Sequence, residues 1–162
     1  MTRLHDLHAQ QGQSPWLDNL RRAWIISGDL GRWVDRGVRG ITSNPSIFQK
    51  AMTGTDDYDD QLRNLVAEGA TIEDSYWALV ARDIVDALEV LRPVHDASGG
   101  VDGYVSVEVN PALASDTDGT IAAARNLDER IDRPNLYVKI PATAEGIPAI
   151  NQMISEGRSV NV

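Results

Sequence analysis

A single lysine lies within an apolar stretch near the end of the sequence. The segment 135–143 reads Asn-Leu-Tyr-Val-Lys-Ile-Pro-Ala-Thr, and its alternation predicts a short buried strand that ends at Pro141. The sequence contains only two lysines, Lys50 and Lys139. A buried ammonium costs several kcal/mol unless it is paired or its pKa falls. Lysines with a lowered pKa form Schiff bases with carbonyl compounds. The alternative is that Lys139 lies at a strand end and reaches water.

Every predicted strand carries a polar side chain near its carboxyl end. The strand 103–111 is the clearest, because three alternate valines give it one continuous apolar face. An aspartate within a strand, as in the segment 14–20, is disfavoured by strand propensity. The asparagine that precedes Pro45 also suits the N-cap of a helix, which is a purely structural role. The polar residues are Asp18, Asn44, Glu108 and Lys139.

The predicted elements alternate between strand and helix along the whole chain. Strands are expected at 14–20, 38–44, 103–110 and 135–140, and a fifth strand begins at 159. Helices are expected at 27–35, 45–52, 73–91, 118–132 and 146–155, and another begins at 55. The helix 73–91 is expected to stop at Pro93. Such alternation predicts a parallel sheet with helical crossovers. Both faces of a doubly wound sheet would be apolar, so the row of polar strand ends favours an α/β fold of the (β/α)8 TIM-barrel type.

A complete barrel needs eight strands and about 250 residues. This chain offers four strands and the start of a fifth in 162 residues. We therefore expect residues 1–162 to form the N-terminal half of one barrel domain. Residues 1–13 are expected to be a flexible arm or a short helix.

Composition narrows the classes of function. The chain has no cysteine, which excludes a disulfide framework and a thiol nucleophile, and its formal net charge is −9. An acidic surface argues against binding to nucleic acid or to an anionic membrane. His5 and His8 lack a third ligand, and the acids at 56–60 lack the spacing of a calcium loop, so no metal site is predicted. Without an apolar N-terminal segment, the cytoplasm is the expected compartment.

Four segments together resemble one enzyme family. They are Ser14-Pro-Trp-Leu-Asp-Asn-Leu20, Gly40-Ile-Thr-Ser-Asn-Pro-Ser-Ile-Phe-Gln-Lys50, Val105-Ser-Val-Glu-Val109 and Asn135-Leu-Tyr-Val-Lys-Ile-Pro-Ala-Thr143. In order and spacing the chain resembles the transaldolases, and the longer bacterial type most closely. The resemblance covers nearly the whole chain and implies a (β/α)8 barrel of the class I aldolase type.

The resemblance also implies an activity. Transaldolases move a dihydroxyacetone unit from sedoheptulose 7-phosphate to glyceraldehyde 3-phosphate, in the non-oxidative pentose phosphate pathway, without a metal or cofactor. Matched by motif, Lys139 is the Schiff-base lysine, and Glu108 transfers protons through a water. Asp18 takes the proton of the C4 hydroxyl as the C3–C4 bond breaks. Asn44 hydrogen-bonds the dihydroxyacetone unit, and Thr42 lines the same mouth.

The chain departs from the family pattern in two ways, and other functions stay open. Asn110 stands where an acid is expected. The family's phosphate-binding Arg and Ser, and a polar residue of the fifth strand, are expected beyond Val162. The isolated 162-residue chain is therefore expected to have little activity. One alternative is a Schiff-base aldolase of the fructose-6-phosphate aldolase type, which releases a free three-carbon product. Another is a non-catalytic fragment that self-associates through the two edges of an open half-barrel.

Overall fold

Five parallel strands form one sheet in chain order. The computed structural model describes residues 2–162 and contains β1 (Trp16–Leu17), β2 (Gly40–Thr42), β3 (Tyr104–Glu108), β4 (Leu136–Lys139) and β5 (Val160–Asn161). Each strand pairs with its neighbour in sequence, in the order β1-β2-β3-β4-β5. This is the arrangement of consecutive strands in a (β/α)8 barrel, and β1 and β5 are its free edges. The predicted four strands and start of a fifth are confirmed.

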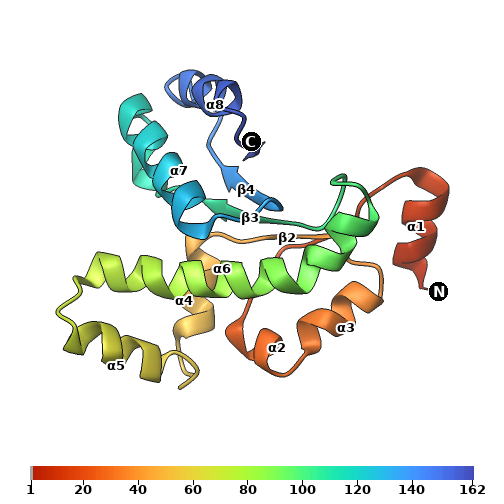
Figure 1. Cartoon of the computed structure of the whole chain (residues 1–162), viewed down its shortest axis with the longest axis horizontal. Coiled ribbons are helices and arrows are strands. Elements are labelled where there is room, and N and C mark those ends of the chain that lie inside the picture. Colours follow the sequence, from red (N-terminus) through yellow and green to blue (C-terminus); the bar gives the residue numbers. More distant parts are fainter. Residues whose placement is uncertain (1) are drawn as a thin grey trace.

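Helices connect the strands and cover one face of the sheet. They are α1 (Arg3–Gln11), α2 (Arg22–Ile26), α3 (Asp29–Asp35), α4 (Pro45–Met52), α5 (Asp59–Ala67), α6 (Ile72–Ala97), a 3-10 turn η1 (Pro111–Leu113), α7 (Thr117–Ile131) and α8 (Gly146–Ser155). The long α6 packs along β3, with α2, α3 and α5 against its other side (Figure 1). Helix α7 packs on β4 and α8 on α7.

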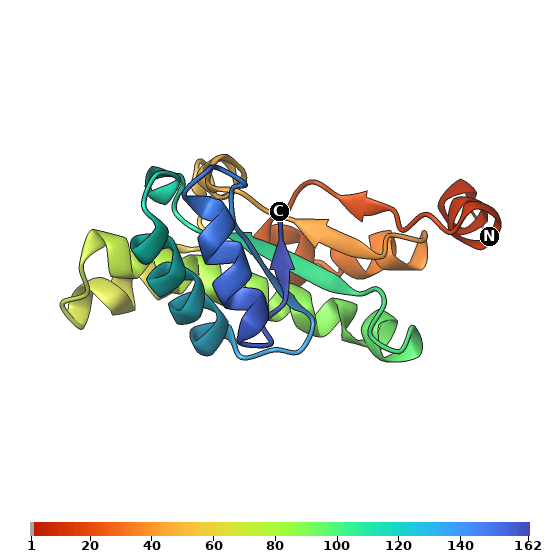
Figure 2. The same ribbon diagram turned by 90° about the horizontal axis from the view of Figure 1, so that it is seen from above.

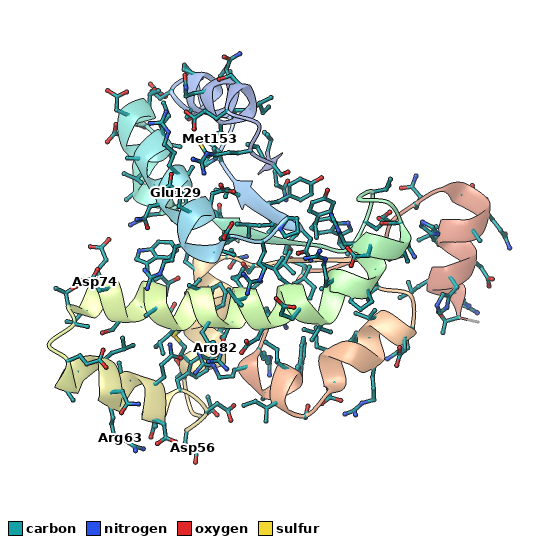
Figure 3. The ribbon with its side chains drawn as sticks, viewed as in Figure 1. Asp56, Arg63, Asp74, Arg82, Glu129 and Met153 are labelled. Carbon is teal, nitrogen blue, oxygen red and sulfur yellow. The ribbon has the colours of Figure 1, made fainter. Side chains whose placement is uncertain are left out.

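The core lies between the helices and the apolar face of the sheet. Ile41, Val105 and Leu136 lie side by side because the register of β2, β3 and β4 aligns them. Each buried aliphatic side chain contributes about 1.5–3 kcal/mol. The helices supply Val80, Ile84, Leu88, Leu91, Ala124, Leu127, Ile131, Ala149 and Met153. Figure 3 shows Met153 on the inner side of α8, whereas the labelled Asp56, Arg63 and Asp74 point away from the core.

Helix α4 begins where the sequence predicts. The Asn44 side chain caps it, since its Oδ1 accepts a hydrogen bond from the Ile47 amide at 2.9 Å. Pro45 occupies the first helical position, where a missing amide hydrogen has no cost. The cap places the carboxyl end of β2 directly at the start of this helix.

The prediction that Pro93 stops the long helix is wrong. Helix α6 continues to Ala97, and backbone bonds resume after the proline, as from the Ser98 amide to the Val94 carbonyl at 3.0 Å. A proline inside a helix costs about 3 kcal/mol, so other contacts must offset it. The last turn has such contacts, because the His95 ring meets the Tyr104 ring edge-on at 5.2 Å.

A buried ion pair anchors α2, which the sequence did not predict. Arg22 is 9% exposed, and its Nε donates to Asp83 Oδ1 of α6 at 2.6 Å. The Tyr58 hydroxyl donates to the other Asp83 oxygen at 2.8 Å, and the Arg22 guanidinium stacks 4.1 Å from the Tyr58 ring centre. These residues are far apart in sequence, so no local pattern indicates the contact that fixes α2.

The first strand is shorter than predicted. Only Trp16 and Leu17 of the segment 14–20 pair with β2. Asp18 lies just beyond the pairing, at the carboxyl end of β1, and the chain turns there toward the buried Leu20. An edge strand has one neighbour, so pairing on one side alone sets its length.

The N-terminal segment contains a helix at one end of the molecule. Residues 1–13 were expected to be a flexible arm or a short helix; Met1 lies outside the described residues, and Arg3–Gln11 form α1. Figure 2 shows α1 beyond the amino ends of the strands. His8 Nε2 lies 3.4 Å from the buried carboxylate of Asp102, which ties α1 to the loop before β3. The flexibility of this arm stays a prediction.

Within residues 2–162, no helix combines the length and apolar character needed to cross a membrane.

Candidate active site

A lysine and a glutamate lie side by side at the carboxyl ends of β3 and β4. The register pairs Glu108 with Lys139, and Lys139 Nζ lies 4.0 Å from Glu108 Oε1. Residues paired in a parallel sheet point to the same face, and here that is the face opposite the helical core. The expected neighbours therefore lie together, although they are 31 positions apart in sequence.

Lys139 is less enclosed than its apolar sequence context predicts. Its side chain is 37% exposed, whereas that of Glu108 is 16% exposed. The flanking Val138 and Ile140 are buried, but they point to the other face of β4, into the core. The apolar character of the segment thus reflects the core face, and the amine lies on the open inner face of the sheet.

The second pair of polar residues lies at the ends of β1 and β2. Thr42 Oγ1 donates to Asp18 Oδ1 at 2.7 Å. Thr42 is in register with Ser106 of β3, two residues before Glu108 on the same face. Asp18 and Thr42 therefore lie on the inner face that carries Lys139 and Glu108.

Asn44 lies near Glu108, and its side chain also serves as the N-cap of α4. Its Oδ1 caps α4, while its amide nitrogen has no hydrogen-bond partner among residues 2–162. Asn44 and Glu108 line the same crevice, together with Tyr76 and Trp77 of α6. Capping fixes the side chain so that its amide nitrogen is available as a donor.

Two further polar residues lie on the inner face and were not among the predicted site residues: Ser106, and Asn161 of β5, although the polar residue of the fifth strand was expected beyond Val162. Asn161 of β5 is in register with Lys139, and its Nδ2 donates to Ser106 Oγ at 3.1 Å. Ser106 is fully buried. Ser106 lies on the polar face that the alternation in 103–110 predicts, and Asn161 extends the row of polar residues at the strand ends to β5, so a fifth strand drawn from 159 could have indicated it. A hollow of about 390 Å³ on this face is lined by Trp16, Thr42, Tyr137, Val160, Asn161 and Val162.

Aromatic rings form a floor toward the amino ends of the strands. Tyr137 stacks on Tyr104 at 4.1 Å and on Trp16 at 6.2 Å between ring centres. Gly40 makes room for this stack, because a Cβ there would lie 2.3 Å from the Trp16 ring. Burial raises the pKa of Tyr137, and the neighbouring Tyr104 and Asp102 raise it further. These rings lie toward the amino ends of the strands, whereas Asp18, Glu108 and Lys139 lie at the carboxyl ends.

This arrangement suits condensation of an amine with a carbonyl compound. A primary amine lies beside a carboxylate that can transfer protons, and a second carboxylate is held by a hydroxyl two strands away. Residues 2–162 contain no cluster of three His, Asp or Glu side chains that could hold a metal ion.

Comparison with known proteins identifies the family. A family model described as "Transaldolase/Fructose-6-phosphate aldolase" matches residues 15–162. A protein of Parafrankia sp. named "Transaldolase" is 49% identical over 160 residues, which are 98% of this chain and 43% of that protein. A "Transaldolase" of Acidothermus cellulolyticus is 51% identical over 152 residues, 93% of this chain and 41% of that protein. "Transaldolase 2" of Streptomyces coelicolor is 48% identical over 155 residues, 95% of this chain and 42% of that protein.

The chain thus spans about two fifths of the length of these relatives. The family model covers nearly all of it, from the residue before β1 to the last residue of the sequence. The match includes Asp18, Thr42, Asn44, Glu108 and Lys139, the polar residues predicted for the site. The chain therefore belongs to the transaldolase/fructose-6-phosphate aldolase family.

Proposed function

We propose that this chain supplies the Schiff-base half of a transaldolase, which transfers a dihydroxyacetone unit from sedoheptulose 7-phosphate to glyceraldehyde 3-phosphate. The observation that carries the proposal is the registered pair of Lys139 and Glu108 at the carboxyl ends of adjacent parallel strands. Catalytic groups of TIM-barrel enzymes occupy that end of the strands. The proposed compartment is the cytoplasm, where sugar phosphates are interconverted.

The first step joins enzyme and substrate. The neutral amine of Lys139 attacks the C2 carbonyl of the ketose phosphate, and the resulting carbinolamine loses water to form an imine. Glu108, 4.0 Å from the amine, transfers the protons that this dehydration needs, directly or through a water. The protonated imine can then accept the electron pair of a breaking C–C bond.

The second step breaks the C3–C4 bond. Asp18 takes the proton of the C4 hydroxyl, the C4 oxygen becomes an aldehyde, and erythrose 4-phosphate leaves. The electron pair of the broken bond passes into the imine as an enamine. The Thr42 hydroxyl donates to Asp18 at 2.7 Å and so orients its carboxylate. Asn44, with its free amide nitrogen, binds a hydroxyl of the three-carbon unit, and Asn161 lies where it can do the same.

The third step decides between two activities of the same family. Addition of the enamine to glyceraldehyde 3-phosphate, followed by hydrolysis, gives fructose 6-phosphate. Protonation of the enamine and hydrolysis would instead release dihydroxyacetone, as in a fructose-6-phosphate aldolase. The family model includes both activities, whereas the three relatives described above are all named transaldolases. Transfer is therefore the proposed activity.

A chimera tests the proposal. Residues 1–162 are joined to the C-terminal part of the Parafrankia transaldolase that this chain does not match, so the site residues are those of this chain. We expect fructose 6-phosphate to form from sedoheptulose 7-phosphate and glyceraldehyde 3-phosphate, and none in the Lys139→Arg chimera. Full activity of Lys139→Arg, or release of dihydroxyacetone in place of transfer, would refute the proposal.

The 162-residue polypeptide alone is proposed to be nearly inactive and to self-associate. Its sheet has two free edges, β1 and β5, and the hollow on its inner face is open. Unpaired edges and exposed sheet faces favour association with another copy. This second proposal, a non-catalytic and self-associating fragment, applies to the polypeptide in isolation.

A further inference from the structure

The strand that carries Asn161 is paired on one side, with β4. It is an edge strand of two residues, Val160 and Asn161. Its parallel pairing with β4 includes bonds in which the Val138 amide donates to the Ser159 carbonyl at 3.1 Å and the Ile140 amide donates to the Asn161 carbonyl at 2.9 Å. A strand this short is weakly specified in register, and a slip of one residue would turn Asn161 to the opposite face.

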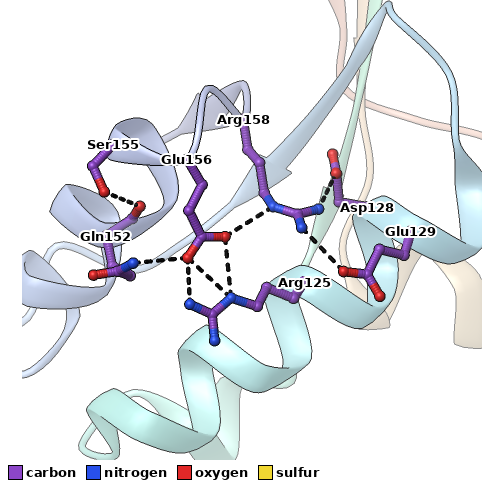
Figure 4. A network of polar contacts seen from close by, with 7 residues as sticks. All are labelled: Arg125, Asp128, Glu129, Gln152, Ser155, Glu156 and Arg158. Atoms are coloured by element: carbon purple, nitrogen blue, oxygen red, sulfur yellow. Dashed lines mark hydrogen bonds and ion pairs between the residues drawn. The ribbon is translucent and has the colours of Figure 1, made fainter.

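A charged network anchors the residues that precede this strand. Arg158 follows the turn after α8, and it donates to carboxylates on two sides (Figure 4). Its Nη1 pairs with Asp128, its Nη2 with Glu129 at 3.0 Å, and its Nε with Glu156 at 3.1 Å. Asp128 and Glu129 lie on α7, which packs on β4. One guanidinium therefore joins the start of β5 to a helix that is already fixed on the sheet.

A second arginine completes the network. Arg125 of α7 pairs with Glu156, and the Gln152 amide of α8 donates to the same carboxylate at 2.8 Å. These bonds, with that from Arg158, hold the pKa of Glu156 at about 2. The Arg158 side chain is only 19% exposed, so its geometry is more restricted than that of a free surface pair. Multidentate networks of this kind are the ion pairs that fix structure.

We propose that Arg158 is a positioning residue for the site: it fixes the start of β5 on α7 and thereby holds the Asn161 side chain opposite Lys139. Three residues of extended chain span about 10 Å, which leaves little freedom between the anchor and Asn161. The catalytic consequence rests on the proposed function. The structural consequence does not, and the two are measured separately.

Amide hydrogen exchange tests the structural part in the 162-residue chain. In Arg158→Leu, we expect the Val138 and Ile140 amides, which donate to β5, to exchange about 10-fold faster. The Val105 and Val109 amides donate to the Asn135 and Lys139 carbonyls at the β3–β4 pairing, so they should keep their rates.

Arg133→Leu is the matched control for this measurement. Arg133 precedes β4 as Arg158 precedes β5, and it pairs with Glu89 of α6 at 2.8 Å. It should leave the exchange of Val138 and Ile140 unchanged. Equal acceleration at all four amides in Arg158→Leu, or acceleration at none, would overturn the inference.

Kinetics in the chimera test the catalytic part. Arg158→Leu should raise the half-saturating concentration of fructose 6-phosphate for borohydride trapping about 10-fold, the effect of losing one hydrogen bond to the ligand. The trapping rate at saturation should not change. Asn161→Ala should give the same shift, and the double variant no more than either single one. Additive shifts, or a lower saturating rate with no shift, contradict the inference. Failure of the unsubstituted chimera to be trapped would instead refute the proposed function.

Discussion

At the scale of single residues, the site consists of pairs rather than isolated groups. Lys139 lies beside Glu108, and Asp18 accepts a hydrogen bond from Thr42. Proton transfer needs a donor and an acceptor within hydrogen-bond reach, in the apo structure or after substrate binding tightens the contact. The division into two pairs matches the division of the proposed reaction into imine formation and C–C bond cleavage.

Asp18→Asn in the chimera should separate these two steps. Loss of a general base lowers the rate of the step it serves by about 10²–10⁴-fold, so transfer should nearly cease. Borohydride trapping with fructose 6-phosphate should stay within about two-fold, because Asp18 acts only at the C4 hydroxyl. Transfer activity is measured by fructose 6-phosphate formation and trapping by mass spectrometry.

Thr42→Val is the control for Asp18→Asn. It keeps the carboxylate but removes the 2.7 Å hydrogen bond that orients it. A loss of about 10-fold in transfer is expected, which corresponds to one hydrogen bond. Undiminished transfer in Asp18→Asn, or loss of trapping together with transfer, would show that Asp18 has another role.

The sequence predicted which polar residues lie together better than it predicted their surroundings. Alternation and strand ends indicated Asp18, Asn44, Glu108 and Lys139, because the period of a strand decides which side chains share a face. The enclosure of Lys139 was not predictable from its neighbours, since Val138 and Ile140 face the core and tell nothing of the other side. The polar residue of the fifth strand was expected beyond Val162, whereas Asn161 is already in register with Lys139, because β5 begins at Val160.

At the scale of elements, the placement of α7, α8 and β5 depends on charge as well as apolar packing. The bonds from Arg125, Gln152 and Arg158 lower the pKa of Glu156 to about 2. A carboxyl group whose pKa is lowered by folding stabilises the native state above its unfolded pKa, about 4.3. That contribution disappears as the pH falls from about 4.3 to about 2.

Glu156→Gln should therefore lower the melting temperature in a pH-dependent way. The difference from the unsubstituted chain is expected to be constant above pH 5 and to shrink as the pH falls from about 4.3 past about 2, because the Glu156 carboxyl group becomes protonated and then, like the Gln side chain, carries no charge. Glu68→Gln, at the exposed end of α5, should show no such trend. Thermal melts followed by circular dichroism between pH 2 and pH 7 measure both. A difference that grows at low pH would contradict the assigned network.

The sequence predicted helices whose ends are set by nearby residues. It missed helices that depend on contacts between segments far apart in the chain. The cap and proline at Asn44 and Pro45 fix the start of α4 within the sequence itself. Helix α6 passes Pro93 because packing after it offsets the cost, and α2 forms around an Arg22–Asp83 contact that joins distant segments. Neither contact has a local signature, so sequence patterns could not indicate them.

At the scale of the whole molecule, the open sheet agrees with the match to only part of each relative. Five strands pair in chain order and leave β1 and β5 unpaired on their outer sides, and the relatives are more than twice as long. A strand edge has unpaired amide and carbonyl groups that can pair with another chain. These edges are the basis of the proposed self-association of the 162-residue polypeptide.

Size-exclusion chromatography with light scattering should find dimers or larger species of this polypeptide. Val162→Lys places a charge just beyond β5, at a residue that is 63% exposed, and should shift the distribution toward monomer. Val101→Lys changes a residue that is 75% exposed in the loop before β3 and should have no effect. A stable monomer of the unsubstituted polypeptide would contradict the proposed association through the edges.

Identification of the modified lysine tests the central claim most directly. The chimera is incubated with fructose 6-phosphate and borohydride, digested, and mapped by mass spectrometry. Because Lys139 lies beside Glu108 at the strand ends while the exposed Lys50 lies on α4, the account predicts one reduced adduct, on Lys139. An adduct on Lys50, or no adduct in a folded chimera, would contradict it.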